Sequence, residues 1–551
     1  MGSVYFIERN GQRYAYNSTS RRVPGKKNPV TDKTYLGKVD PITGKIIPKE
    51  SRKRPDSECA KLYGAVRLLD HVQDGMGIRR DLDEAFFGRG DNILGAAMSQ
   101  VIDPSSFDDI HYVVEGSIIQ EKLSLKGKLS PAVMSDLSKE VGGSLYCMDQ
   151  FFGMRVAAAT TGSFAIDLTS ISSYSQMGGW TEWGKNRDGE ELKQINVAMV
   201  TDASGIPTMF KMLPGSVADM STLKDLVDDM ERLGCKGSRL VMDRGFESAS
   251  NVHGMLELGV PFVMPSNARS EPIKKLMTRA VKDMRDSSSL ASHDGDTYKF
   301  IEYQVAVVED ENDDGYEYLV RLPQSEKGSA ENNRRFDEGR KLKAFVVYDP
   351  RKASKDLQFL GSTIAEAESK LDGSKFRFPQ KQFDKLMPSV RRCLDWNVDD
   401  DGVMHVSRKQ NAITFADNRT GLFVMLASED LDWYQAMGSY DTRNVVEEAF
   451  DAYKNDLDAG RMRTGDPERA RGRLFIKFVA LIMRTCIMNV LKDEKCVVKD
   501  MTVEQMFRSL NTVMAIGSPG DWRLTAVTKT NRKIFEAFGL EAPKSGKIAL
   551  S

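Results

Sequence analysis

One segment in the last quarter of the chain carries four side chains that could act together on a phosphate group. Tyr440, Arg443, Glu447 and Lys454 stand at offsets of 0, 3, 7 and 14 residues. At about 100° per residue, a helix over 434–457 would present all four within an arc of about 60°. A carboxylate binds hard cations, whereas guanidinium and ammonium groups bind phosphate oxygens. The spacing therefore predicts a helix face suited to phosphoryl chemistry.

The alternative for this helix is an ordinary surface ion pair. Glu447 stands four residues after Arg443, and such a pair stabilises a helix by only a few tenths of a kcal/mol. An ion pair explains neither Tyr440 nor Lys454. The adjoining arc holds apolar residues, including Val446 and Phe450, so the helix would have a burying side next to its reactive side.

Two aspartates lie in or directly after predicted strands. Asp167 is expected at the end of a strand over 163–168, and Asp243 follows a strand over 239–242. Carboxylates at the ends of apolar strands lie at the rim of a sheet, where they can meet a ligand. The alternative is that each caps a helix or a turn. Three other carboxylates are interpreted as structural: Asp202, Asp219 and Glu448.

The elements that would position these carboxylates form a β-β-β-α-β-α-β series. This order predicts an α/β fold with a mixed sheet flanked by helices, an order found in RNase H-like domains. The strands are expected over 163–168, 195–200, 206–212, 239–242 and 260–264, with helices over 219–233 and 247–258.

The patterns along the chain divide it into six parts. Residues 1–60 hold thirteen Lys and Arg against six Asp and Glu, so a basic β arm that binds DNA and a merely solvated hairpin both remain open. The predicted parts are a basic N-terminal β arm (1–57), a helical domain that is a candidate for DNA-end binding (58–159), the first part of an RNase H-like core (160–266), a mostly β insertion domain (267–430), the second part of the core (431–500) and a C-terminal helical segment (501–551).

The composition excludes several classes of protein. The chain has 551 residues with 40% hydrophobic and 28% charged residues, which excludes a wholly disordered or collagen-like chain. Its formal net charge is −1, so a nucleic-acid partner requires locally segregated charge. The six cysteines form no C-x-x-C pair and no two of the five histidines stand at i, i+4 spacing, which argues against a disulfide frame and a zinc site.

No signal peptide or membrane span is predicted. The most apolar run, 474–491, is interrupted by Lys477 and Arg484 and repeats at helical spacing, which indicates a buried helix. We therefore expect a cytoplasmic protein with no membrane partner.

The helix motif resembles that of a known family, the bacterial insertion-sequence DDE transposases of the IS-four superfamily, whose signature is Y-x-x-R-x-x-x-E-x(6)-K. Tyr440, Arg443, Glu447 and Lys454 keep every spacing of it. The run Asp243-Arg244-Gly245-Phe246 resembles the second-aspartate motif of the family, the hairpin over 205–215 resembles another family element, and Leu36-Gly37-Lys38-Val39-Asp40 resembles the start of one large subgroup. One departure is Arg473 after Gly472, where the family leads us to expect His.

The resemblance implies an RNase H-like fold with a β insertion between the second Asp and the Glu. It implies that Asp167, Asp243 and Glu447 bind two Mg²⁺ or Mn²⁺ ions, which suit carboxylate ligands and in-line displacement at phosphorus. Four residues would then contact DNA phosphates: Tyr440, Arg443, Lys454 and Arg244.

The implied activity is cut-and-paste DNA transposition. The enzyme would cleave double-stranded DNA at terminal inverted repeats and join the 3′-ends to target DNA, acting as a homodimer on paired ends in a bacterial or archaeal cytoplasm, associated with the nucleoid. Two alternatives remain: a metal-dependent nuclease that does not join ends, and a non-catalytic DNA-binding relative. Trp433 and Trp396 are further candidates, for stacking on a flipped base.

Overall fold

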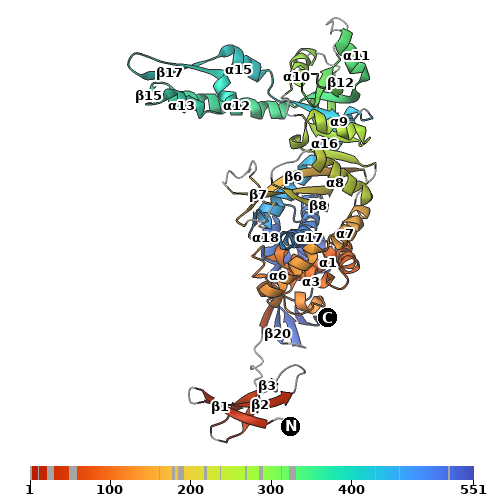
Figure 1. Ribbon diagram of the computed structural model, residues 1–551, viewed down its shortest axis with the longest axis vertical. Coiled ribbons are helices and arrows are strands. Elements are labelled where there is room, and N and C mark those ends of the chain that lie inside the picture. Colours follow the sequence, from red (N-terminus) through yellow and green to blue (C-terminus); the bar gives the residue numbers. More distant parts are fainter. Residues whose placement is uncertain are drawn as a thin grey trace.

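The computed structural model is an elongated molecule with a small sheet at the N-terminal end and an arm that projects sideways near the other end (Figure 1). The structure describes residues 3–9, 12–21, 30–41, 43–48, 59–159, 162–175, 180–183, 192–215, 220–235, 237–266, 270–284, 289–311, 313–321, 330–428, 430–457, 459–518 and 521–550.

The N-terminal segment forms an antiparallel β-sheet, as the sequence predicts. Tyrosines cluster on it: the rings of Tyr5 and Tyr16 stack with centroids 5.7 Å apart, and Lys33 lies 5.8 Å from the Tyr5 ring centroid. Aromatic and β-branched residues favour such a pleated surface. Its strands are β1 Ser3–Arg9, β2 Gln12–Arg21, β3 Val30–Val39 and β4 Ile46–Pro48.

A helical body follows, and its core is continuous with that of the central sheet. In helix α6, Pro131 is the first residue, a position where its missing amide hydrogen costs no hydrogen bond and its fixed φ suits the helix. The helices are α1 Gly64–Gly75, α2 Ile78–Phe86, α3 Gly90–Ile102, α4 Ile110–Glu115, α5 Ile119–Lys122, α6 Pro131–Gly143 and α7 Leu145–Ala157.

Helix α17, Pro467–Lys492, runs through this body. By length and composition it could cross a membrane, but 78% of its apolar window is buried inside the protein. It packs on α6 and α3, which makes it the core helix that the interrupted apolar run predicts.

The central sheet confirms the β-β-β-α-β-α-β order. It is mixed, because β6 pairs in parallel with β9 and β9 with β10, whereas β7 and β8 pair antiparallel. Its first elements are β6 Ser163–Ser173, β7 Gln194–Asp202, β8 Pro207–Pro214, α8 Met220–Arg232, β9 Arg239–Met242, α9 Ala249–Glu257 and β10 Phe262–Pro265.

Strands of the predicted insertion extend this same sheet. The strand order is β11-β12-β14-β18-β10-β9-β6-β7-β8, with β13 paired to β12 and β19 paired to β6. The elements within the predicted insertion are α10 Glu271–Asp283, β11 Leu290–His293, β12 Asp296–Glu309, β13 Tyr316–Val320, α11 Ala330–Glu338, β14 Arg340–Tyr348 and β18 Leu422–Ala427. The helix α16 Trp433–Asp451 and the strand β19 Arg461–Met462 follow it.

Helices cover both faces of the extended sheet. On β18, Val424 and Leu426 belong to the core that includes Leu276 of α10, whereas Met425 belongs to the core that includes Trp433 of α16. Because side chains alternate along a strand, α10 and α16 lie on opposite faces.

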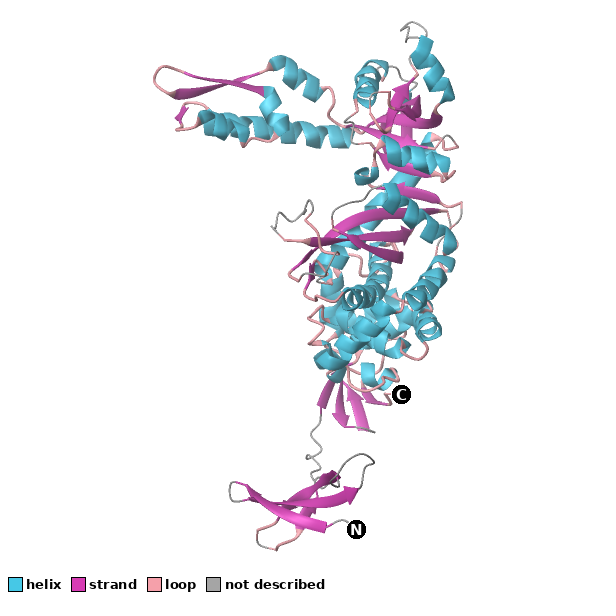
Figure 2. Cartoon of the chain, in the orientation of Figure 1, coloured by secondary structure: helices cyan, strands magenta, loops and turns pink. Residues whose placement is uncertain are grey.

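The predicted insertion is mixed rather than mostly β, which corrects the sequence analysis. Between β14 and β18 the chain forms a projecting arm with its own apolar core and a small three-stranded sheet (Figure 2). The charge-rich pattern there belongs to helices whose outer faces are in solvent. The arm comprises α12 Pro350–Leu371, β15 Ser374–Lys375, α13 Pro379–Asp384, α14 Pro388–Cys393, β16 Leu394–Val398, β17 Val403–Arg408 and α15 Gln410–Asp417.

The C-terminal segment is also not wholly helical. One of its strands pairs with β5, Cys59–Leu62, in a four-stranded sheet, so the two ends of the body are joined by a β-ladder that local periodicity does not reveal. The segment comprises α18 Val503–Leu510, β20 Met514–Ser518, β21 Asp521–Leu524, α19 Lys529–Ala537 and β22 Gly546–Ile548.

Helices α6 and α17 touch through glycine. A methyl group on Gly142 would overlap the carbonyl oxygen of Glu468, and one on Gly472 would overlap the carbonyl oxygen of Ser138. These contacts are with backbone, which cannot rotate away. Gly472 therefore has a packing role.

We expect Gly142→Ala to lower the free energy of unfolding by about 1–3 kcal/mol, because the two helices must separate to admit the methyl group. Gly361→Ala, within α12 where nothing lies within 4 Å of the added methyl, is the matched control and should be neutral or slightly stabilising. Thermal denaturation of both variants measures this, and equal melting temperatures would show that the close approach is unimportant.

Candidate active site

Parallel pairing of β6 with β9 brings the two predicted aspartates together. Ile166 is the register partner of Met242, so Asp167 and Asp243 are the next residues on adjacent strands. Asp167 is 4% exposed and its Oδ1 accepts a hydrogen bond of 2.7 Å from the Leu168 amide. The side chain of Asp243 is 20% exposed.

The two aspartates differ in their place on the strands. Asp243 directly follows β9, as predicted. Asp167 does not end its strand, because β6 continues to Ser173 through a run of polar residues that still pairs with β7. The apolar pattern stops earlier than the hydrogen-bonded ladder, and this misplaced the predicted strand end.

Helix α16 crosses the sheet over these aspartates and is anchored at three points. Asp432 and Gln435 form a capping box at its start. Arg239 of β9 donates a 3.0 Å hydrogen bond to the Ser439 hydroxyl. Gly205, in the β7–β8 turn with φ +78°, lies so close that an added Cβ would be 2.8 Å from the Cβ of Val445. The hairpin thus needs glycine both for its turn and for the seating of α16.

Arg443 joins the predicted carboxylates. Its Nε donates a 3.0 Å hydrogen bond to Oε1 of Glu447, and it forms an ion pair of 3.6 Å with Asp243. Burial opposes the charge on Arg443, but the hydrogen bond with Glu447 and the charges of Glu447 and Asp243 leave its pKa raised. The guanidinium therefore stays charged within the carboxylate group.

Tyr440, in the preceding turn of the helix, contacts Arg443. Its ring stacks on Phe423 of β18 with centroids 5.6 Å apart, and its hydroxyl accepts a 2.9 Å hydrogen bond from Arg443. Burial raises the pKa of Tyr440, partly offset by Arg443, so the phenol remains protonated and keeps a donor for a further acceptor.

Lys454 lies beyond the regular part of the helix. The α-helix ends at Asp451, and a π turn over Ala452–Asp456 follows, with the Leu457 amide bonded to the Ala452 carbonyl at 2.9 Å. Each residue of a π turn rotates by a smaller angle about the axis than in an α-helix, so the direction of Lys454 differs from the one predicted for a regular helix. Arg244 is exposed in the short 3₁₀ turn Arg244–Phe246 that follows Asp243.

Two of the other carboxylates have structural partners. Asp202 accepts hydrogen bonds of 2.9 Å from the amides of Ser204 and Ile206 in the β7–β8 turn, and Glu448 pairs with Lys492. Asp219 lies outside the described residues.

The two tryptophans pack within the protein. Trp433 is 2% exposed and stacks on Phe300 at 4.7 Å, so it is not accessible to a flipped base. Trp396 packs beside Phe383 in the arm, with ring centroids 5.8 Å apart.

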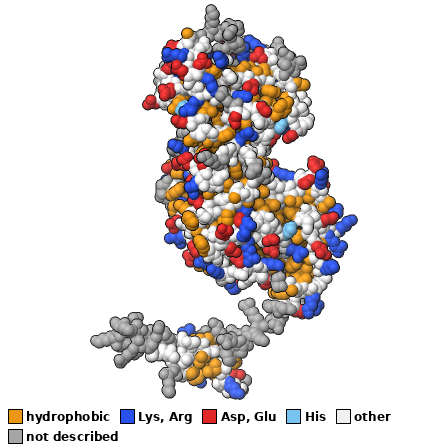
Figure 3. Space-filling view, turned by 90° about the vertical axis from the view of Figure 1, so that its right-hand side faces the viewer, with side chains coloured by type: hydrophobic (Ala, Val, Ile, Leu, Met, Phe, Trp, Pro, Cys, Tyr) orange, Lys and Arg blue, Asp and Glu red, His pale blue; other side chains and the backbone are white. Residues whose placement is uncertain are grey.

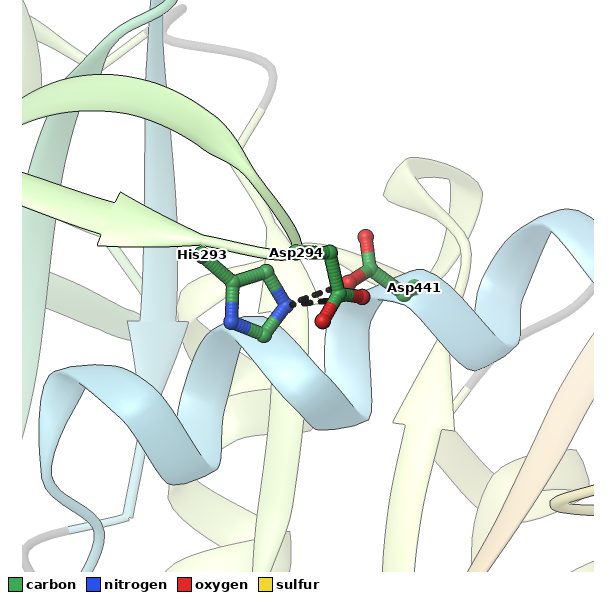
Figure 4. A group of neighbouring side chains, drawn as sticks. All are labelled: His293, Asp294 and Asp441. Carbon is green, nitrogen blue, oxygen red and sulfur yellow. Dashed lines mark hydrogen bonds and ion pairs between the residues drawn. The ribbon is translucent and has the colours of Figure 1, made fainter.

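A second group could bind a metal ion. Among the described residues, His293, Asp294 and Asp441 have one potential ligand atom each within 4.8 Å of one another (Figure 4). His293 Nε2 lies 2.7 Å from Asp441, whereas Asp294 is 84% exposed. This contact links the β11–β12 turn to α16 one residue after Tyr440. This group could not be predicted from the sequence because His293 and Asp441 are 148 residues apart along the chain.

The donor set around Arg443 fits a hard cation better. Asp167, Asp243 and Glu447 supply only carboxylate oxygens, which suit Mg²⁺ or Mn²⁺. Arg443 already shows that positive charge is accommodated between Asp243 and Glu447. The residue types present therefore fit the metal role that the resemblance implies, and in this structure Arg443 contacts two of the three carboxylates.

Comparison with protein families agrees with this chemistry. The family model described as "Transposase DDE domain" matches residues 159–483, more than half of the chain. The chain belongs to this DDE transposase family. All of the carboxylates and phosphate-binding candidates above lie inside the matched residues, and proteins of this family act as transposases that use divalent metal ions.

A solved structure named as the cryo-EM structure of a piggyBac transposase synaptic complex with hairpin DNA is similar at 11% sequence identity and a TM-score of 0.35. The match covers 83% of this chain and 82% of that one. No curated protein matches the chain.

We expect Mn²⁺ to bind this DDE transposase through Asp167, Asp243 and Glu447. Asp243→Asn should weaken Mn²⁺ binding at least tenfold, measured by electron paramagnetic resonance of free Mn²⁺, because it removes an anionic ligand. Asp294→Asn tests the His293 group as a matched control and should leave the affinity unchanged. The opposite pattern would move the metal site to His293, Asp294 and Asp441.

Proposed function

We propose that this protein is a cut-and-paste DNA transposase of the IS-four type with an RNase H-like core. The observation that carries the proposal is the contact of Arg443 with both Asp243 and Glu447, beside Asp167, inside the matched DDE domain. Support for the subgroup comes from the unbroken spacing of Tyr440, Arg443, Glu447 and Lys454.

Asp167, Asp243 and Glu447 would hold two divalent ions. When bound, the ions would activate the attacking water or 3′-hydroxyl and stabilise the leaving oxygen of an in-line displacement. Burial of Asp167 beneath α16 keeps its carboxylate in one orientation. Arg443 would turn from the carboxylates to the charge of the DNA phosphate, and the Tyr440 hydroxyl would hold it at the site through their hydrogen bond.

The N-terminal sheet would bind the transposon end. Besides Lys33 on Tyr5, it places Lys38 5.9 Å from the Tyr14 ring centroid and Arg13 5.1 Å from that of Phe6. Basic side chains on an aromatic surface suit a nucleic acid backbone. On the face that Figure 3 draws, basic and acidic side chains are otherwise interspersed.

In the full proposal, the protein binds double-stranded inverted repeats and target DNA. It acts as a homodimer on paired ends in the bacterial or archaeal cytoplasm. The deciding experiment combines purified protein, linear DNA bearing the element's own ends, a supercoiled target plasmid and Mg²⁺ or Mn²⁺. We expect excised and joined products with the wild type and none with Asp243→Ala. Cutting without joining would indicate a nuclease, and DNA binding with neither would indicate a non-catalytic relative.

Glu447→Gln should abolish cleavage, with a rate at least a hundredfold lower, yet leave end binding within about threefold, because it removes a metal ligand and no phosphate contact. Electrophoretic mobility shift and cleavage assays on the same DNA measure both. Glu448→Gln is the matched control on the adjacent face and should cleave normally. Equal loss of binding and cleavage in Glu447→Gln would contradict a purely catalytic role.

A further inference from the structure

A small basic pocket lies beyond the carboxylate group and has no role in the function described so far. Its volume is about 90 Å³, and it is bounded by three separate parts of the chain: the α3–α4 loop, strand β19 and helix α17. Four of its lining residues are cationic and none is acidic: Arg461, Arg463, Arg473 and Lys477. A chain with a net charge of −1 has thus gathered positive charge at one place.

Each of these cations contacts an aromatic ring or a backbone carbonyl. Arg461 and Arg463 lie 5.9 and 6.0 Å from the ring centroid of Tyr174. On the opposite wall, Arg473 lies 5.3 Å from the ring centroid of Phe107. Lys477 donates a 2.6 Å hydrogen bond to the Leu457 carbonyl, directly after the π turn. Lys477 is buried and Arg473 half-buried, so these two side chains have little entropy to lose when a ligand binds, whereas Arg461 and Arg463 are exposed.

Two buried donors of this pocket have no hydrogen-bond partner among the described residues. They are Nε of Arg473 and the hydroxyl of Ser105. Buried polar atoms are normally paired, and an unpaired one costs about 1–3 kcal/mol. Burial and the nearby Arg469 lower the pKa of Arg473, and the charge of Asp108 offsets this only in part. An anion with several acceptor oxygens would satisfy both donors and the positive charge.

The pocket is aligned with the carboxylate group. Arg461 of β19 is the register partner of Ser172 on β6, the strand that carries Asp167 five residues earlier. At about 3.3 Å per residue this separation is about 17 Å. For B-form DNA whose axis runs along β6, with about 3.4 Å of rise per nucleotide, that distance spans about five nucleotides.

We propose that this pocket binds one backbone phosphate of the DNA substrate, about five nucleotides from the phosphate that is cleaved. The inference rests on the proposed function for its substrate, and it assigns to Arg463, Arg473 and Ser105 the role of positioning the DNA end over the carboxylates. Arg473, which departs from the family pattern, is thereby a phosphate ligand of this chain.

The test is a double-mutant cycle that combines substitutions in the protein with replacements of phosphates in the DNA. Binding is measured in EDTA so that no cleavage occurs. Each phosphate of a transposon-end duplex is replaced in turn by an uncharged methylphosphonate, and affinity is measured by fluorescence anisotropy. At one position near the fifth nucleotide, we expect the replacement to weaken wild-type binding roughly tenfold and to have no further effect on Arg463→Gln/Arg473→Gln. The double variant should also lower the slope of log K against log salt by about 0.9.

Arg532→Gln, an exposed arginine of α19, is the control for loss of charge and should remain sensitive to the methylphosphonate. Two single variants separate the loss of a ligand from misfolding: Arg463→Gln, at an exposed position, and Ser105→Ala. Each should be less sensitive to the methylphosphonate than the wild type, and each should have the melting temperature of the wild type. The inference is wrong if the wild type cuts and joins DNA but no phosphate replacement affects the wild type and the double variant differently. That outcome would leave the proposed function intact.

If inorganic phosphate at millimolar concentration abolishes the difference between wild type and the double variant without weakening DNA binding, the pocket serves a free anion and the inference is wrong. A wild type that binds no DNA would overturn both proposals.

Discussion

The contact of Arg443 with Asp243 and Glu447 is the interaction on which the catalytic reading of this structure depends. The two carboxylates come from parts of the chain that are separated by all the elements from α9 to β18. Two like charges so close need a cation between them, and Arg443 supplies one from the same helix face as Glu447. Arg443 therefore offsets only part of the negative charge of Asp167, Asp243 and Glu447, and the rest remains to attract metal ions.

The sheet explains how such distant segments meet. Strands β12, β14 and β18 of the inserted segment continue the hydrogen-bonded ladder from β10, so the insertion returns the chain to the edge from which it left. Helix α16 then begins directly beyond β18 and crosses back over β9 and β6. The arm departs from this path between β14 and β18 with its own core, which leaves the crossing of α16 undisturbed.

Charge is organised locally. The chain as a whole is nearly neutral, yet Arg443 and Lys454, the pocket around Arg473 and the N-terminal sheet each present cations, several of them on aromatic rings. Long-range attraction to DNA would be weak at this net charge, so recognition has to come from sites of defined geometry. The π turn matters in this respect, because it redirects the chain from the catalytic helix to β19 and the basic pocket.

The sequence by itself determined the elements of the catalytic core. Period-two and period-3.6 patterns are local, and they correctly predicted β9, the order from β6 to β10 and the helix that carries Glu447. The spacing of Tyr440, Arg443 and Glu447 also placed them on one face, because three residues of a regular helix share a face whatever surrounds them.

Only the tertiary structure decided what depends on contacts between distant residues. Pairing decided that Asp167 lies inside a longer strand, that the insertion shares the core sheet and that β5 joins the C-terminal strands. Packing decided that Trp433 is buried, that Gly142 and Gly472 hold two helices together, and that Arg473 and Ser105 meet in one pocket. Residue type and spacing along the chain carry the local preference of the backbone, whereas such contacts are set by the burial of surfaces that no short window of sequence contains.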